Sequence, residues 1–284
     1  MSIKIDLHMH SIASDGTWTV DELLREIQKN KIDIFSVTDH DTIESSEKIK
    51  NKKLPDGCTF IPGVEISSTY KDREYHLTVY NYENSEELSS FIKNNNDMRL
   101  EYNYKFIDLM SKVYPEVSLD DYFNNYEEDP SKGGWKALNY FIDNDIFKDI
   151  GEYFHKLKNT GLKLIFKSPE EVVEISKKCK GKIFLAHPSY YYREGCMPEE
   201  ELNYWKDIGI DGIECFTPYA MKKFQEKYYF NYARKNNLMI SGGSDCHGEY
   251  LGRNLGVPAV YLDQLDIDQL IDLENFKKHF KRGI

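Results

Sequence analysis

Two histidines near the start of the chain, His8 and His10, are separated by a single residue, and Asp6 precedes them with the same spacing. Residues two apart point to the same side of a strand, so the two imidazoles are expected to leave a strand end side by side. Neighbouring imidazoles can bind a metal ion, or they can form a polar pair at the end of a strand. This stretch alone leaves both interpretations open.

Residues that can bind metal recur within or just after later predicted strands. Asp245 and His247 have the same spacing as His8 and His10. The set is His8, His10, His40, Glu65, His76, His187, Asp245 and His247. In parallel α/β barrels the C-terminal strand ends converge on one rim, where the chemistry of such folds is placed. Imidazole with carboxylate favours zinc, manganese or iron over calcium, and the set exceeds what one ion can use. We therefore expect two or three divalent metal ions, with Glu65 able to bridge two of them.

Other polar residues near these positions have simpler interpretations. Asp39 is expected to orient the imidazole of His40. Asp6 could support a ligand in the same way or simply end its strand, and Asp15 has the sequence context of a turn. The two remaining histidines lie in amphipathic helical patterns and are expected to be ordinary helix residues: His155 and His279.

Composition narrows the class of protein. The chain has 284 residues and a net charge of −11, which argues against a broad basic surface for long duplex nucleic acid but not against a nucleotide or a short oligonucleotide. Its five cysteines are scattered without a C-x-x-C pair, so a reducing cytoplasmic location without a disulfide framework is predicted, and Cys246 is expected to face away from its neighbours and pack. No apolar run approaches the roughly 20 residues of a membrane span, and no leader pattern is visible.

Strand and helix patterns alternate as a parallel α/β sheet requires. Strands are predicted at residues 3–7, 32–40, 59–66, 74–82, 183–186, 211–215 and 238–241. Capping boxes predict helices after Thr19 and Ser168, and a further helix start is predicted at Asp41. Residues 85–164 break the alternation with helical patterns at 88–113, 136–144 and 150–157, which indicates a mainly helical insertion.

Several short motifs, taken in order, resemble those of the PHP (polymerase and histidinol phosphatase) family. They are HMH at 8–10, SDG at 14–16, SVTDHDT at 36–42, GVEIS at 63–67, His76, AHP at 186–188 and GSDCHG at 243–248. The resemblance implies a distorted (β/α)7 barrel formed by residues 1–84 and 165–284, interrupted by the insertion at 85–164, with a trinuclear metal centre. It also implies the ligand set His8, His10, Asp15, His40, Glu65, His76, His187, Asp245 and His247, in which Asp15 becomes a ligand.

The activity that this resemblance implies is that of a metal-dependent phosphoric ester hydrolase (EC 3.1). A hydroxide bridging metal ions held by Glu65 and Asp245 would attack phosphorus. The helical insertion and the later motifs resemble a branch acting on nucleoside 3',5'-bisphosphates or, as 5'-to-3' exonucleases, on RNA ends. A small phosphorylated nucleoside is therefore the expected substrate. The alternatives are exonuclease action on short oligonucleotides, hydrolysis of histidinol phosphate, or an inactive metal-binding regulatory module.

Substrate contacts are less defined by the sequence. Arg193, shortly after His187, is a candidate for binding a phosphate, although it could equally be a solvated loop arginine. Lys167 is a weaker candidate for the same role, and Arg99 and Arg253 are weaker still. The insertion departs from the resembled branch, because residues 132–136 (KGGWK) stand where a Gly-Arg-x-His-like stretch is usual.

Overall fold

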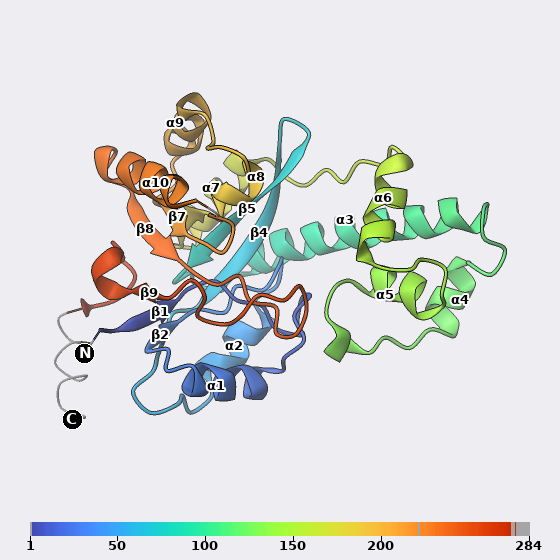
Figure 1. The fold of residues 1–284 in the computed structure, drawn as a ribbon, viewed down its shortest axis with the longest axis horizontal. Coiled ribbons are helices and arrows are strands. Elements are labelled where there is room, and N and C mark those ends of the chain that lie inside the picture. Colours follow the sequence, from blue (N-terminus) through green and yellow to red (C-terminus); the bar gives the residue numbers. More distant parts are fainter. Residues whose placement is uncertain (1, 221, 274–275, 277–284) are drawn as a thin grey trace.

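The computed structural model describes residues 2–220, 222–273 and 276. Its strands are β1 (Lys4–Asp6), β2 (Ile34–Phe35), β3 (Thr59–Phe60), β4 (Gly63–Tyr70), β5 (Arg73–Tyr80), β6 (Lys182–Leu185), β7 (Gly212–Phe216), β8 (Met239–Gly242) and β9 (Val260–Tyr261). They form two sheets, in the orders β3-β2-β1-β9 and β4-β5-β6-β7-β8. Figure 1 shows these sheets at one end of the molecule and a group of helices at the other.

The helices fall into two groups. Those around the sheets are α1 (Val20–Lys29), α2 (Glu44–Lys50), α7 (Pro169–Lys178), α8 (Pro188–Tyr191), α9 (Glu199–Ile208) and α10 (Lys223–Lys235), and those of the insertion are α3 (Glu86–Ser111), α4 (Leu119–Asn124), α5 (Lys136–Asp143) and α6 (Ile150–Asn159). Short 3₁₀ turns lie at Pro130–Lys132 and Leu262–Gln264. Within the described ranges no helix combines the length and apolarity that crossing a bilayer needs.

The sheets are mixed, so the expectation of an all-parallel sheet is wrong. β1, β2 and β3 pair in parallel, as do β6, β7 and β8. β5 pairs antiparallel with both β4 and β6, and β9 pairs antiparallel with β1. β4 and β5 form a hairpin, because Lys71 and Asp72 both adopt positive φ angles of 48° and 61° in the two-residue turn. Such a turn matches the twist of antiparallel strands.

Two isolated pairs link the ends of the sheets. Met9 pairs with Cys246, and His40 pairs with Glu65, both in parallel. The segments after β1 and β8 therefore meet, as do the segment after β2 and strand β4. The mixed α/β class expected from the sequence is present, but these hydrogen bonds leave two linked sheets and do not close a seven-stranded barrel.

The helix starts in the structure can be compared with those that local sequence signals predict. Both predicted capping boxes are confirmed, with Thr19 before α1 and Ser168 before α7. The predicted start at Asp41 is wrong, because α2 begins after Ile43 and Asp41 has a φ of 48°. The Asp41 carboxylate instead accepts hydrogen bonds from the backbone of Ser67 at 3.0 Å and from the Asn95 side chain at 2.9 Å. These tertiary contacts replace the predicted helix cap.

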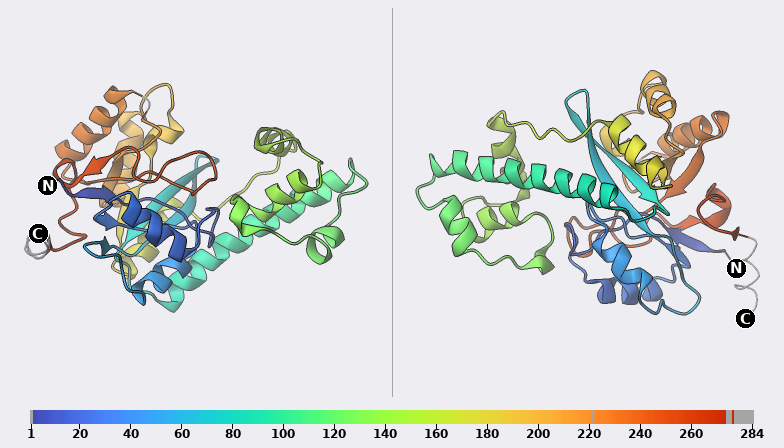
Figure 2. Two further views of the ribbon diagram at one scale, coloured as in Figure 1. Left: turned by 60° about the horizontal axis from the view of Figure 1, so that its bottom comes forward. Right: turned by 180° about the vertical axis from the view of Figure 1, so that it is seen from behind.

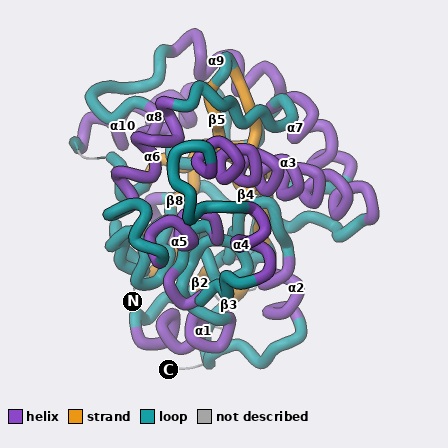
Figure 3. Tube along the Cα trace, turned by 90° about the vertical axis from the view of Figure 1, so that its right-hand side faces the viewer, coloured by secondary structure: helices purple, strands orange, loops and turns teal. Residues whose placement is uncertain are grey.

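The insertion has its own hydrophobic core, but its first helix belongs to both parts of the molecule. Figure 2 shows α3 running from the sheets into the insertion, and Figure 3 views the molecule from that side. Leu88 and Ile92, at the start of α3, pack in the main core. Phe106 and Ile107, further along, pack with Phe141 and others in the core of the insertion.

Candidate metal centre

The structure brings all nine candidate ligands into one cluster. His8 and His10 follow β1, His40 follows β2, Glu65 and His76 lie in β4 and β5, His187 follows β6, Asp245 and His247 follow β8, and Asp15 lies in the loop before α1. Eight of them are buried, and the His76 side chain is 16% exposed. Residues spread over almost the whole chain therefore share one small volume.

Glu65 lies at the middle of the cluster and is fully buried. Its two carboxylate oxygens face five imidazoles at nitrogen–oxygen distances of 2.9–3.3 Å: His8, His10, His40, His76 and His187. A carboxylate placed in this way can share its two oxygens between neighbouring cations.

Two further carboxylates, those of Asp245 and Asp15, extend the cluster around His10. Asp245 Oδ1 lies 3.1 Å from His10 Nε2 and 3.5 Å from His8 Nε2. Asp15 Oδ2 lies 3.3 Å from His247 Nε2, and Asp15 Oδ1 lies 3.6 Å from His10 Nδ1. Asp15, which local sequence alone placed in a turn, is therefore within the cluster, as the family motif implied.

The nitrogen and oxygen atoms of the cluster are better placed to bind metal ions than to make hydrogen bonds with one another. Several are buried without a hydrogen-bond partner among the described residues: His8 Nε2, His10 Nδ1 and Nε2, His40 Nδ1, His76 Nδ1 and Glu65 Oε2. Unpaired buried polar atoms cost free energy, and a shared cation would satisfy them. Three sets of donors lie within 4.8 Å of one another: His10, Asp15, His40 and His247; His8, His10 and Glu65; and His40, Glu65 and His76. The cluster can therefore hold more than one divalent ion.

Charge within the cluster is strongly coupled. Burial lowers the pKa of His8, but the carboxylates of Glu65, Glu214 and Asp245 outweigh it and raise that pKa well above its usual value. Burial also lowers the pKa of His10, but hydrogen bonds to Asp245 and Glu65 outweigh that effect, so the pKa rises to about 9. Metal binding requires neutral imidazoles, so ions entering the cluster must displace protons.

Glu214, in β7, is a functional candidate that sequence reasoning missed. Its Oε2 lies 3.1 Å from His8 Nδ1 and accepts a hydrogen bond of 2.7 Å from the backbone nitrogen of His187. A carboxylate on Nδ1 fixes the ring so that Nε2 faces the metal site. The available signal was a single carboxylate inside the otherwise apolar strand pattern at residues 211–215.

Asp6 and Asp39 hold the loops that carry other ligands. Asp6 accepts hydrogen bonds from the backbone of Ser244 at 2.9 Å and of Gly256 at 2.8 Å, which fixes the segment before Asp245. Asp39 accepts from the Ser11 backbone at 2.7 Å and from the Ser14 hydroxyl at 2.9 Å. The expected contact of Asp39 with the His40 imidazole is therefore replaced by contacts with the loop that carries Asp15.

Asp245 is held from its outer side by two further residues. Arg253 Nη1 donates to Asp245 Oδ2 at 2.5 Å, and the Tyr219 hydroxyl donates to the same oxygen. Asp245 Oδ1 is thereby directed toward His10. Neither contact could be read from the sequence, since Tyr219 lies 26 residues before Asp245.

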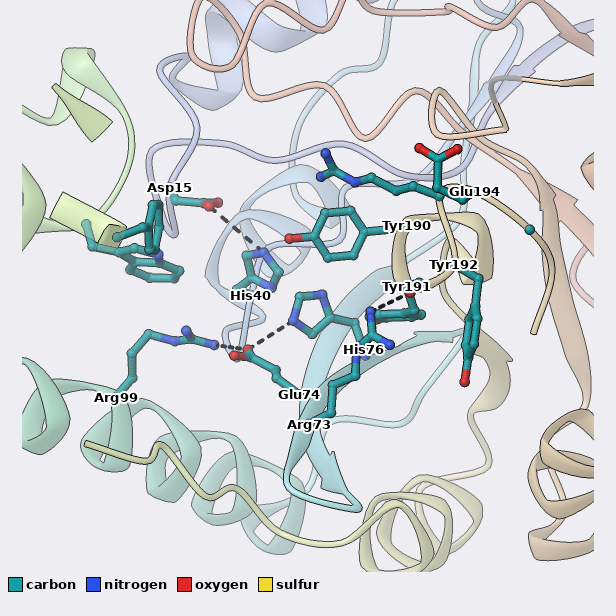
Figure 4. Close-up of a pocket in the computed structure, with 14 residues that line it drawn as sticks. Asp15, His40, Arg73, Glu74, His76, Arg99, Tyr190, Tyr191, Tyr192 and Glu194 are labelled. Atoms are coloured by element: carbon teal, nitrogen blue, oxygen red, sulfur yellow. Dashed lines mark hydrogen bonds and ion pairs between the residues drawn. The ribbon is translucent and has the colours of Figure 1, made fainter. Parts of the chain in front are cut away.

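His76 is held in a similar way by Glu74 and Arg99. Glu74 Oε1 lies 3.0 Å from His76 Nε2 and 2.8 Å from Arg99 Nη2, and Figure 4 shows the three side chains in a row. Burial raises the pKa of Glu74, but Arg99 and His76 outweigh it and hold the pKa well below its usual value. Arg99 is thus a positioning group and not a free cation.

The cluster opens into a cavity of 790 Å³ that carries cationic and aromatic side chains (Figure 4). It is lined by Asp15, His40, Arg73, Glu74, His76, Arg99, Trp135, Phe154, Tyr190, Tyr191, Tyr192, Arg193, Glu194 and Gly195. Arg193 is exposed, and its guanidinium lies 5.1 Å from the centre of the Tyr190 ring. The predicted phosphate contact of Arg193 is thus compatible with its position.

This cavity is not lined by Lys167, His155 or Cys246. Lys167 is not among its lining residues and lies 3.3 Å from Glu171, so the structure gives its expected substrate role no support. His155 is exposed on α6 and pairs with Asn159, as an ordinary helix residue would. His279 lies outside the described residues. Cys246 packs in a hydrophobic cluster with Met9, as expected.

The unusual stretch at 132–136 contacts the metal cluster directly. Gly133 and Gly134 have φ angles of 68° and 73°, which side chains rarely tolerate. The nitrogen of Gly134 donates to the carbonyl oxygen of Asp15 at 2.8 Å, and a Cβ on Gly133 would meet that same oxygen at 2.9 Å. The two glycines therefore let the insertion approach the loop that carries Asp15, and they place Trp135 at the cavity.

Known proteins with similar sequences span nearly the whole chain. A 5'-3' exoribonuclease of Haemophilus influenzae is 24% identical, with 90% of this chain and 95% of the relative covered. The 5'-3' exoribonuclease Rnm of Escherichia coli is 23% identical, with 91% of each covered. A 3',5'-nucleoside bisphosphate phosphatase of Chromobacterium violaceum is 24% identical, with 89% of this chain and 90% of the relative covered.

Solved structures and a family model agree on the fold. A candidate metal-dependent phosphoesterase from Bifidobacterium adolescentis superposes with a TM-score of 0.74 at 23% identity, covering 94% of both chains. A Chromobacterium violaceum protein described as an amidohydrolase gives 0.70 at 22% identity, covering 88% of this chain and 89% of the other. The family model for the PHP domain matches residues 6–151, just over half of the chain. Together with the order of its strand-end motifs, this match shows that the protein belongs to the PHP domain family.

Proposed function

We propose that this protein is a metal-dependent phosphoesterase that hydrolyses phosphate monoesters of small molecules. The observation that carries the proposal is the cluster around Glu65, whose unpaired nitrogen and oxygen atoms open into a cavity lined by arginines. Metal-binding groups and phosphate-binding groups therefore face the same space. The nine ligands of the sequence prediction, arranged around three ions, are part of this proposal.

Divalent ions in the cluster would lower the pKa of water toward neutrality and neutralise charge on the phosphoryl oxygens. Glu65 and Asp245, whose oxygens lie 3.3 Å and 3.1 Å from His10 Nε2, would hold these ions. Arg73 and Arg193 supply positive charge at the outer part of the cavity, and neither has a carboxylate within ion-pair distance in the part of the chain that the structure describes. A second phosphate of the substrate would lie near these two guanidinium groups.

A phosphorylated nucleoside, such as a nucleoside 3',5'-bisphosphate, is the proposed substrate. Aromatic side chains on the cavity wall, among them Tyr190 and Trp135, offer stacking faces, and the relative from Chromobacterium violaceum is named for such a substrate. The names of the Haemophilus influenzae and Escherichia coli relatives favour a second candidate, 5'-to-3' exonuclease action on short oligonucleotides. The net charge of −11 favours the smaller substrate.

A screen that measures phosphate release and, for RNA, separates the nucleotide products by chromatography tests the proposal. Protein loaded with manganese, iron or zinc is incubated with adenosine 3',5'-bisphosphate, nucleoside monophosphates, short 5'-phosphorylated RNA, histidinol phosphate and p-nitrophenyl phosphate. The account expects bisphosphate hydrolysis that depends on the metal and is lost in His8→Ala. Metal-loaded protein without turnover on any ester would instead favour an inactive metal-binding module.

A further inference from the structure

A second, smaller cavity adjoins the metal centre on the side of the insertion. It has a volume of 160 Å³ and shares His40, Arg99 and Trp135 with the larger cavity. Its other lining residues are Ala13, Ser14, Asn96, Leu100, Asn103, Tyr122, Glu128, Gly134 and Lys136. A molecule in this space, here called the amide pocket, would reach the edge of the metal cluster at His40.

Asn103 is the reason to expect a ligand in the amide pocket. Its side chain is only 7% exposed, yet no described residue makes a hydrogen bond to its amide. Other buried asparagines nearby use their amide nitrogens: that of Asn95 donates to Asp41 at 2.9 Å, and that of Asn139 donates to the Gly133 carbonyl at 2.8 Å, while Asn95 Oδ1 has no partner among the described residues. The donor and acceptor of the Asn103 amide are accessible from the cavity that Asn103 lines, so a polar ligand there can make hydrogen bonds to both.

The placement of Asn103 on α3 supports the same interpretation. Asn96 and Asn103 are seven residues apart, with Arg99 and Leu100 between them, and this spacing puts all four on one face of the helix. All four line the amide pocket. The side-chain amide of Asn96 likewise has no hydrogen-bond partner among the described residues. Two unpaired amides therefore face one cavity from one helix.

The amide pocket also has aromatic and cationic lining residues. Trp135 borders both cavities, and the Arg99 guanidinium lies 4.6 Å from the centre of its ring. The Lys136 amine lies 4.9 Å from the centre of the Tyr122 ring and makes no ion pair with a described carboxylate. Flat, apolar surfaces beside unpaired amides suit a planar heterocycle with polar edges better than a sugar or an aliphatic chain.

We propose that the amide pocket binds the nucleobase of the substrate, and that Asn103 makes hydrogen bonds to its edge while its phosphate reaches the metal centre past His40. This inference rests on the proposed function. An asparagine amide offers a donor and an acceptor side by side, the arrangement that pairs with the N6 and N7 edge of adenine. The pocket therefore makes adenine the preferred base, and Asn103 a specificity-determining residue.

Kinetics on two substrates test this assignment. In Asn103→Ala and in the isosteric Asn103→Asp, kcat/KM for adenosine 3',5'-bisphosphate should fall by about 10- to 100-fold, the value of one good bidentate contact to a base. Turnover of p-nitrophenyl phosphate, which has no base, should be unchanged. The matched control is Asn94→Ala, because Asn94 is exposed on the same helix and lines neither cavity.

Binding of the nucleoside alone separates this inference from the proposed function. Calorimetry with adenosine, which carries no phosphate, should show binding to the wild type and to Asn94→Ala and loss of binding in both Asn103 variants. Thermal melts identify variants that fail to fold. Equal adenosine binding and equal kcat/KM in folded Asn103→Ala and wild type would overturn the assignment while leaving the phosphoesterase intact. If no ester is hydrolysed, the proposed function fails, and adenosine binding still decides whether the pocket takes a base.

Discussion

At the residue scale, Glu65 has the most contacts with other proposed ligands. It is fully buried, and its two oxygens face five imidazoles from four different segments of the chain. Burial raises its pKa, but His8, His40 and His76 outweigh that effect and hold the pKa well below its usual value. Glu65 therefore stays ionised and available to cations.

Substituting this carboxylate should remove both metal and activity. In Glu65→Gln, one negative charge and one metal-binding oxygen are lost, so metal affinity should fall by more than the about 10- to 100-fold that outer contacts typically cost. Metal content after gel filtration and phosphate release measure the two effects. The control is Glu83→Gln, because Glu83 pairs with Lys180 at an exposed position. Full metal content in Glu65→Gln would contradict its placement among the ligands.

Glu214 should act through the imidazole that it orients. In Glu214→Gln, the hydrogen bond to His8 Nδ1 loses its charge, so metal affinity should fall by about 10- to 100-fold while saturating metal restores most of kcat. Activity measured against metal concentration distinguishes this weaker binding from loss of catalysis. A variant with unchanged metal affinity would show that Glu214 has a purely structural role.

The coupled charges also predict how metal affinity depends on pH. His10 has a pKa of about 9 in the metal-free cluster, so its imidazole is protonated below that pH. An entering ion must displace this proton, and the pKa values of His8 and His76 are raised as well, so apparent affinity should rise with pH up to at least about pH 9. Chelator competition across this range, with proton release measured by calorimetry in two buffers, checks the sign. Affinity that falls as pH rises would be inconsistent with it.

At the scale of elements, the ligands depend on segments that pass very close to one another. A Cβ on Gly243, just after β8, would lie 2.5 Å from the backbone nitrogen of His8. Only a glycine allows β8 to leave the sheet beside the residues that follow β1. The two ligand pairs, His8 with His10 and Asp245 with His247, meet because of this contact.

Gly243→Ala should therefore push the two segments apart. We expect the free energy of unfolding to fall by about 1–3 kcal/mol, as for other forced contacts in a packed core, together with weaker metal binding. Chemical denaturation and metal titration measure these effects. The control is Gly57→Ala, because Gly57 has open space around it, although its φ of 81° adds some strain. If Gly243→Ala is no less stable than Gly57→Ala, the close contact is not required.

Local sequence predicted the helices better than the strands that join them. The capping residues Thr19 and Ser168 act within four residues of themselves, so their helices were predictable. Residues 71–73 are typical of a turn, but they carry no strong signal for the positive φ angles of Lys71 and Asp72, so the antiparallel pairing of β4 with β5 was not predicted. The predicted helix cap at Asp41 is wrong because Ser67 and Asn95, which are distant in sequence, donate hydrogen bonds to its carboxylate.

At the scale of the whole molecule, the insertion and the sheets complete one site together. The segment at 132–136 contacts the Asp15 loop through Gly134, and α3 contributes Arg99, Asn96 and Asn103. Sequence periodicity predicted these helices, but it could not show which face of α3 looks toward the metal centre. The clustering of the proposed ligands was predictable because family motifs mark them, whereas Glu214, Tyr219 and Arg253 contact the cluster from distant segments.

The core of the insertion should therefore affect substrate binding without affecting the metal. Phe141, in α5, is fully buried, and its ring lies 4.6 Å from that of Phe147. Phe141→Ala should lower the free energy of unfolding by about 3–5 kcal/mol and raise KM, because α5 follows Trp135 directly. Metal content should not change. Loss of metal in a folded Phe141→Ala protein would mean that the cluster itself depends on the insertion core.

The most direct test of the central claim is an anomalous-difference map from crystals grown with manganese, recorded at wavelengths on both sides of the manganese absorption edge. The account predicts two or three peaks, each within bonding distance of several of the nine side chains around Glu65, and at least one next to His40 where the two cavities meet. Manganese peaks only elsewhere on the molecule, or side chains that remain bound to one another at full manganese concentration, would contradict it.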